Sequence, residues 1–207
     1  SVLEFVKRSS PKSKVIYLSS YSVYGENYRF KLKENFKTKP VSIYAKNKKK
    51  AENLCLNYSN KYNSDLLIMR VASLYGEGLE KQFIHDACQK LKNKINNFYG
   101  TGEEKRDFIH ISDMCKLVLH FIKKDFQGSN VINCGTGNGQ KIKDVLNLIL
   151  KHLNIDITPI FNRAGLKDNP KNLIANIKKL ETLGFSPKKN FNTGIKQYIN
   201  WFKKNNI

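Results

Sequence analysis

Short apolar runs alternate along this chain with longer stretches whose apolar residues recur at helical spacing. The pattern predicts an apolar strand over residues 14–19, a helix over 44–62 and a second apolar strand over 65–71. The polar segment before the helix ends at Lys39-Pro40, where the proline favours a break before a new helix. Two strands joined by a helix form a β-α-β unit, in which the strands run parallel and the crossover is right-handed.

The alternation continues through the second part of the chain. A helix predicted over residues 80–92 places four apolar side chains on one face, namely Phe83, Ile84, Ala87 and Leu91. Further strands are predicted over 107–111, 130–133 and 157–161, and further helices over 112–124, 141–153, 176–183 and 191–203. This alternation of strands and helices is typical of an α/β protein.

The composition limits the class of protein. Of the 207 residues, 40% are hydrophobic, which suffices for a buried core. The chain has no apolar run of about 18 residues and no charged-then-apolar leader, so neither membrane insertion nor secretion is indicated. The four cysteines form no C-x-x-C pair and the four histidines show no metal-ligand spacing. We therefore expect reduced thiols, no metal site and a cytoplasmic location.

The net charge of +20 raises the question of nucleic-acid binding, because Lys and Arg side chains bind phosphates. Only five of the 37 basic residues are arginine, the residue best suited to bidentate phosphate and base contacts. The lysines are spread through every segment of the chain. A solvated lysine-rich surface is therefore favoured over a nucleic-acid or other anionic partner.

Three residues carry candidate chemistry. Tyr44 and Lys48 lie four residues apart at the start of the predicted helix and share one face. An ammonium beside a phenol stabilises the phenolate, which lets tyrosine act as a general base. Ser20 ends the preceding strand and adds a hydroxyl. The alternatives are a tyrosine that rests on the core, a surface lysine and a serine that caps a turn.

Ordered motifs surround these residues and continue to the end of the chain. They occupy residues 14–25, 41–52, 67–76, 105–113, 130–137 and 183–187. Together they resemble the extended short-chain dehydrogenase/reductases, specifically the NAD-dependent nucleotide-sugar epimerase/dehydratase family. The resemblance implies a Rossmann-type parallel sheet with a smaller α/β substrate-binding lobe.

The resemblance starts in the middle of the family's Rossmann domain. Residues 1–7 resemble the helix that precedes the serine-bearing strand, and the chain contains no Gly-x-x-Gly-x-x-Gly turn for a dinucleotide pyrophosphate. We expect residues 1–76 to be the C-terminal half of an NAD-binding domain and 77–207 a substrate-binding lobe. Strand 130–133 is expected to return to the main sheet. Tight binding of NAD or NADP then requires a preceding glycine-rich part.

The family implies roles for the residues at these positions. Tyr44 would be the base, Lys48 would also hydrogen-bond the nicotinamide ribose, and Ser20 would hydrogen-bond the reacting oxygen of the sugar. Ser19 and Val71 would line the cofactor side of the site.

The resemblance also implies contacts with substrate. Arg106 occupies the position of a clamp on the substrate diphosphate, with an ion pair to Asp107 or to a nearby carboxylate as the alternative. Ser73 stands where many relatives have an asparagine that contacts the nucleotide sugar, and Arg163 is a candidate second phosphate ligand. Arg70 is expected to brace the sheet instead of touching substrate.

One departure from the family separates the possible reactions. Its 4,6-dehydratases carry a consecutive Asp-Glu pair after the catalytic hydroxyl, whereas this chain has Tyr21 and Ser22 there. Without an acid and a base at these positions, elimination of water is disfavoured. We interpret the chain as part of a nucleotide-sugar epimerase, with a ketoreductase or a non-catalytic relative as alternatives. The resemblance further implies a nucleotide-diphosphate sugar as substrate, a homo-oligomer and a role in surface polysaccharide biosynthesis.

Overall fold

The computed structural model describes residues 2–25, 30–163 and 170–205. Its main sheet has three parallel strands in the order β1, β2, β6, formed by Val15–Ser20, Leu66–Val71 and Ser129–Cys134. The strand predicted over 130–133 is β6, and it pairs with β2 in this sheet. The expected α/β fold with a parallel sheet is confirmed.

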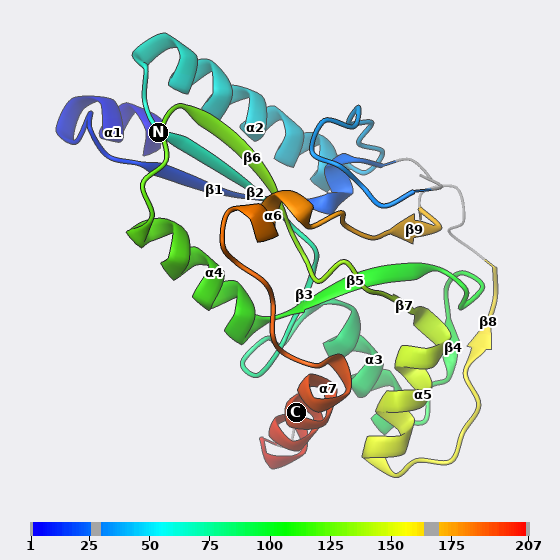
Figure 1. Cartoon of the computed structure of the whole chain (residues 1–207). Coiled ribbons are helices and arrows are strands. Elements are labelled where there is room, and N and C mark those ends of the chain that lie inside the picture. The colour runs from blue at the N-terminus through cyan, green and yellow to red at the C-terminus, as the bar shows by residue number, and fades with distance from the viewer. Residues whose placement is uncertain (1, 26–29, 164–169, 206–207) are drawn as a thin grey trace.

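Helices cover both faces of the main sheet (Figure 1). These helices are α1 (Val2–Ser9), α2 (Ile43–Tyr62), α4 (Ile111–Lys123) and α6 (Lys178–Thr182), and a 3-10 turn, η1 (Tyr21–Val23), follows β1. Leu66 and Ile68 of β2 pack toward α1 and α2, and Leu67 and Met69 pack toward α4 and α6. Because successive side chains of a strand point to opposite faces, the apolar run of β2 contributes to both cores.

A second group of elements has its own apolar core. Its strands are β3 (Ser73–Tyr75), β4 (Asn97–Phe98), β5 (Lys105–His110), β7 (Gly139–Lys141), β8 (Ile160–Phe161) and β9 (Asn172–Leu173). Strand β5 pairs in parallel with β3 and β9 and antiparallel with β7, and β4 pairs with β8. The helices α3 (Gln82–Lys92), α5 (Ile142–Leu153) and α7 (Phe191–Lys204) contribute to this core. The division of the chain near Gly76 stays a prediction.

Most predicted elements are present, with ends shifted by one or two residues. The strand predicted over 157–161 is only Ile160–Phe161, and the helix predicted over 176–183 is only Lys178–Thr182. Strands β3, β4, β7 and β9 were not predicted, because two or three residues are too few to show a periodicity.

Strand β1 forms one edge of the main sheet. Within the described residues it pairs only with β2, so one row of its backbone groups faces outward. Leu18 of this strand is 45% exposed. The carboxyl ends of β1 and β2 lie beside the start of α2, and most of the candidate site residues lie at this junction.

Candidate active site

A cleft of about 630 Å³ opens at the carboxyl ends of β1 and β2. Its lining includes seven of the eight residues predicted to form the site, namely Ser19, Ser20, Tyr44, Lys48, Val71, Ser73 and Arg106. In a parallel sheet, ligands bind where strands end and loops begin. The structure therefore brings residues from β1, α2, β2, β3 and β5 to one place.

Tyr44 and Lys48 occupy the first two turns of α2. The helix begins after Ser42, whose Oγ accepts a hydrogen bond from the Ala45 backbone N–H at 3.1 Å. Lys48 Nζ donates to the Leu18 carbonyl at 2.8 Å and lies 5.9 Å from the centre of the Tyr44 ring. The ammonium is thus anchored on β1 while facing the phenol, and Tyr44 itself is 57% exposed.

Ser20 ends β1 and lies in the same cleft. Its Oγ accepts hydrogen bonds from the Ser22 backbone N–H at 3.2 Å and from Ser22 Oγ at 3.0 Å. A hydroxyl has two acceptor sites and one donor, so both acceptor sites are filled and the proton is left to donate. Ser20 therefore caps η1, as the alternative interpretation predicted, and also presents a donor.

Ser19 points away from Ser20 into the protein. Its Oγ donates to Glu52 Oε1 at 2.6 Å, and the residue is 4% exposed. This geometry favours a supporting part over a direct contact with a cofactor through the side chain. Val71 ends β2 and also lines the cleft.

The positions of the dehydratase acid and base hold no carboxyl group. Tyr21 is buried, and its burial together with the nearby Asp107 carboxylate raises the pKa of the Tyr21 phenol well above its ordinary range. Ser22 is engaged with Ser20. Neither side chain offers an acid or a base at neutral pH.

Arg106 lies on β5 and lines the cleft. Its Nη1 donates to the Lys105 carbonyl at 2.9 Å. Burial lowers the pKa of Arg106 to about 10, so the guanidinium stays charged at neutral pH. Asp107 is directed elsewhere: its carboxylate accepts from Thr136 N–H, Thr136 Oγ1, Gly137 N–H and Ala175 N–H.

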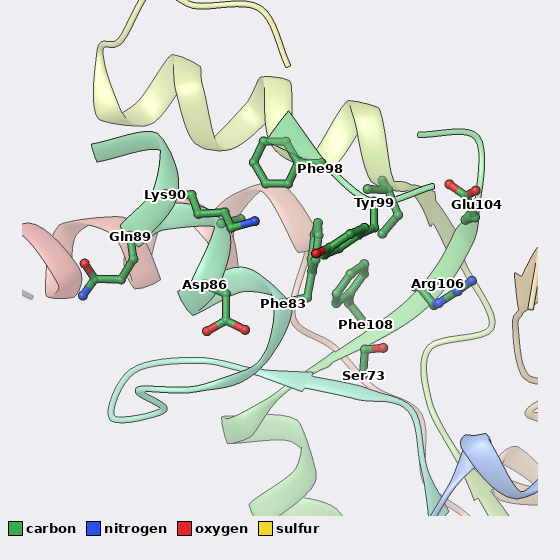
Figure 2. A pocket seen from close by; sticks show the side chains of 12 residues that line it. Ser73, Phe83, Asp86, Gln89, Lys90, Phe98, Tyr99, Glu104, Arg106 and Phe108 are labelled. Atoms are coloured by element: carbon green, nitrogen blue, oxygen red, sulfur yellow. The ribbon is translucent and has the colours of Figure 1, made fainter. Parts of the chain in front are cut away.

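A second cavity, also of about 630 Å³, adjoins the cleft, and Ser73 and Arg106 line both. Figure 2 shows its aromatic side chains Phe83, Tyr99 and Phe108 close together, with Lys90 on α3, the helix that also carries Phe83. Lys90 Nζ lies 5.8 Å from the Tyr99 ring centre. Such aromatic faces suit a planar ligand, and the arginine shared by both cavities suits an anionic group between them.

Arg163 is the predicted residue that the structure leaves outside both cavities. It is exposed and follows β8, and its backbone N–H donates to the Gly100 carbonyl at 3.0 Å. Residues 164–169 lie outside the described residues, so the role of Arg163 as a second phosphate ligand stays a prediction.

Sequence reasoning missed a buried ion pair beneath the cleft. Arg70 donates through Nε and Nη2 to the two carboxylate oxygens of Glu52, each at 2.9 Å. This agrees with the expectation that Arg70 braces the sheet. Its partner was not predicted, because a glutamate 18 residues away on a polar helix carries no local signal.

The described residues hold neither a metal-binding cluster nor a membrane-spanning helix. No group of three or more His, Cys, Asp or Glu side chains there is placed to hold a metal ion. No helix within the same ranges has the length and hydropathy needed to cross a bilayer.

Comparison with known proteins agrees with this geometry. Residues 1–135 match the model of the NAD dependent epimerase/dehydratase family. The chain belongs to this family. An uncharacterized protein of Methanocaldococcus jannaschii is 31% identical over 208 residues, which are 99% of this chain and 63% of that protein. A second protein of that organism, described as a putative UDP-glucose 4-epimerase, is 27% identical over 219 residues and is covered to 68%.

A solved structure shows the same fold with ligands bound. The UDP-glucuronic acid 4-epimerase of Bacillus cereus, in complex with UDP-glucuronic acid and NAD, matches with a TM-score of 0.89 at 26% identity. The match covers 98% of this chain and 65% of that enzyme. The chain of this family member therefore spans about two thirds of the length of these relatives.

Proposed function

We propose that the protein containing this chain is an NAD-dependent nucleotide-sugar epimerase. The observation that carries the proposal is the joint placement of Ser20, Tyr44 and Lys48 in a cleft that continues through Arg106 into an aromatic cavity. A nucleotide sugar has a reacting alcohol, a diphosphate and a planar base in the same order. NAD, when bound, supplies the acceptor and donor of hydride.

The residues present fit the nicotinamide end of NAD. Lys48 and Val71 border the cleft next to Tyr44, where a ribose hydroxyl finds an ammonium donor. The glycine-rich turn that binds a pyrophosphate is absent from the 207 residues, so the remainder of the dinucleotide needs other residues.

Tyr44 takes the proton of the sugar alcohol in this proposal. The Lys48 ammonium, fixed on the Leu18 carbonyl and 5.9 Å from the centre of the Tyr44 ring, is the positive charge beside the phenol in this step. Ser20 donates its free proton to the same sugar oxygen as it becomes a carbonyl, and so stabilises the charge that develops there.

Binding of substrate and choice of reaction rest on other residues. Arg106 pairs with the diphosphate, and the base stacks among Phe83, Tyr99 and Phe108. Because Tyr21 and Ser22 supply no acid or base for elimination, the keto-sugar keeps its other substituents. The keto-sugar then rotates within the cleft, so that hydride returns to the opposite face of its carbonyl carbon.

The test is a tyrosine variant of the protein that contains this chain. UDP-glucose, UDP-glucuronic acid and UDP-N-acetylglucosamine are offered, and 4-epimers are separated by chromatography. Tyr44→Phe should lower kcat roughly 100-fold or more, because general base catalysis contributes about that much, while bound NAD is retained. Tyr62→Phe, at the far end of α2, is the matched control and should turn over normally. Normal turnover by Tyr44→Phe contradicts the mechanism.

The same assay separates the alternatives. Stoichiometric consumption of NADPH identifies a ketoreductase that uses Tyr44, Lys48 and Ser20 without turning the sugar over. Absence of both NAD binding and turnover identifies a non-catalytic relative.

A further inference from the structure

A buried carboxylate lies in the helix that carries Tyr44 and Lys48. Glu52 follows Lys48 by one turn of α2, and none of its surface is exposed. Its Oε1 accepts from Arg70 Nε and from Ser19 Oγ, at 2.9 and 2.6 Å. Its Oε2 accepts from Arg70 Nη2 and Lys49 Nζ, at 2.9 and 3.2 Å. Four donors thus offset the cost of burying this charge.

Arg70 extends the network to the rest of the main sheet. Its Nη1 donates to the Tyr24 hydroxyl at 3.0 Å and to the Glu34 carbonyl at 3.1 Å. The Tyr24 hydroxyl in turn donates to Asn133 Oδ1 at 2.7 Å. One guanidinium on β2 therefore connects α2, the segment after β1, and strand β6.

The network joins the two elements that carry the candidate site. Ser19, which binds Glu52, directly precedes Ser20 on β1. Tyr44 lies eight residues before Glu52 on α2, about 12 Å along the helix axis at 1.5 Å per residue. A bidentate arginine–carboxylate pair has a fixed, planar geometry. It therefore sets both the height and the rotation of α2 against the ends of β1 and β2.

We propose that Glu52 and Arg70 are positioning residues that set the separation between the Tyr44 hydroxyl and the Ser20 hydroxyl. The inference rests on the proposed function, since it concerns the geometry of that reaction. Neither residue is among those that line the cleft in the described part of the chain. Their effect passes through α2 and through the Ser19–Ser20 end of β1.

The experiment replaces the pair with apolar residues of similar size. Exchange of a buried ion pair for well-packed apolar side chains is often neutral for stability, so Glu52→Met with Arg70→Met separates positioning from folding. In the active protein that contains this chain, we expect a Tm close to that of the parent and a KM within about twofold. The value of kcat should fall roughly 10- to 100-fold, because a misplacement of about 1 Å costs that much. An unchanged kcat overturns the proposal.

A second variant covers the case in which the double variant fails to fold. Arg70→Lys keeps a buried positive charge but loses the planar fork, so it should show the same loss of kcat. A crystal structure gives a readout that is independent of activity. A variant structure in which Tyr44 and Ser20 superimpose on the parent contradicts the proposal whatever the activity.

A matched control distinguishes positioning from general weakening of the fold. Asp113 is 2% exposed and accepts hydrogen bonds from the Lys188 and Lys189 backbone N–H groups, each at 2.8 Å. Asp113→Asn should lower Tm without lowering kcat, and an equal loss of kcat there overturns the proposal. Tyr44→Phe is measured beside these variants and reports on the proposed function. Normal turnover by Tyr44→Phe contradicts the proposed reaction, but it does not contradict the part of Glu52 and Arg70 in placing the two hydroxyls.

Discussion

The backbone N–H and the hydroxyl of Ser22 fill both acceptor sites of the Ser20 hydroxyl, which leaves the Ser20 proton to donate. In the proposed reaction, Ser20→Ala removes the donor to the developing carbonyl oxygen, so it should lower kcat about 100-fold, as loss of one such donor does in other enzymes. Ser22→Ala should cost less, because the Ser22 backbone N–H still holds Ser20 at 3.2 Å. Steady-state kinetics on the active protein measure both. Equal turnover by Ser20→Ala and the parent contradicts the assigned donor.

Arg106 differs from a surface arginine because burial lowers its pKa to about 10. In the proposed function Arg106 pairs with the diphosphate. A charged hydrogen-bond partner contributes about 1.5–3 kcal/mol, so Arg106→Leu should raise KM roughly 10- to 100-fold with a smaller change in kcat. In the parent, KM should stay flat from about pH 7 to 8.5 and rise as pH approaches the pKa. Arg8→Leu on α1 is the matched control.

Arg163→Leu in the same series tests whether that residue is a second phosphate ligand.

At the scale of elements, the long segments were predictable and the short ones were not. Strand β2 is a short continuous apolar run and helix α2 is a segment of 20 residues, so both are recognisable, and the Tyr44–Lys48 spacing follows directly from the helix. Strands β4 and β9 have two residues each, and their pairing with β8 and β5 joins segments that lie far apart in the sequence. The Glu52–Arg70 pair joins a helix to a strand, so no local spacing in the sequence announces it.

The turn after β6 depends on the absence of a side chain at Gly135. A Cβ there would lie 2.5 Å from the Tyr21 hydroxyl oxygen and 2.6 Å from Asp107 Oδ2, both of which are buried. Gly135→Ala should lower the free energy of unfolding by about 1–3 kcal/mol, as forced overpacking does. Denaturant titration of the chain measures this.

A double variant tests the cause of that loss. The Tyr21 hydroxyl is buried without a hydrogen-bond partner among the described residues, so Tyr21→Phe alone should cost little. Gly135→Ala combined with Tyr21→Phe should be more stable than Gly135→Ala alone. Strict additivity of the two changes contradicts a direct clash.

His110, at the junction of β5 and α4, should make the free energy of unfolding depend on pH. Burial lowers the pKa of His110, although Glu77, whose Oε2 lies 3.1 Å from Nε2, opposes this. The unfolded chain then binds a proton near pH 6.5 that the folded chain does not, so stability falls as pH drops below about 6.5. Asn is a good N-cap, so His110→Asn keeps the acceptor for Ser112 N–H and removes the titration.

The measurement is Tm between pH 7.5 and 5.5. The parent should lose stability toward pH 5.5, and His110→Asn should lose less. A residual slope is expected from His152, whose pKa is also lowered by burial and by nearby lysines. Identical slopes for the two proteins contradict the assignment to His110.

At the scale of the whole molecule, two features have a joint consequence: among the described residues β1 pairs only with β2, and the 207 residues contain no glycine-rich dinucleotide turn. The isolated 207-residue chain should bind NAD very weakly and turn over no sugar alone. Its edge strand, with Leu18 exposed, should promote self-association. Calorimetry with NAD and sedimentation velocity measure the two effects, and Leu18→Lys should reduce association. Micromolar NAD binding, or a clean monomer with this edge bare, contradicts the prediction.

The order β1, β2, β6 also governs how the chain reaches its native state. In chain order, β3, α3, β4, β5 and α4 lie between β2 and β6. The main sheet is therefore completed by a contact between distant parts of the sequence. Pairings of this kind fold slowly, because a long loop must close before the contact forms. On the ribosome, the edge of β2 that pairs with β6 stays open until residue 134 has emerged. We expect Leu66–Val71, an apolar strand with an unpaired edge, to need protection from association during that interval.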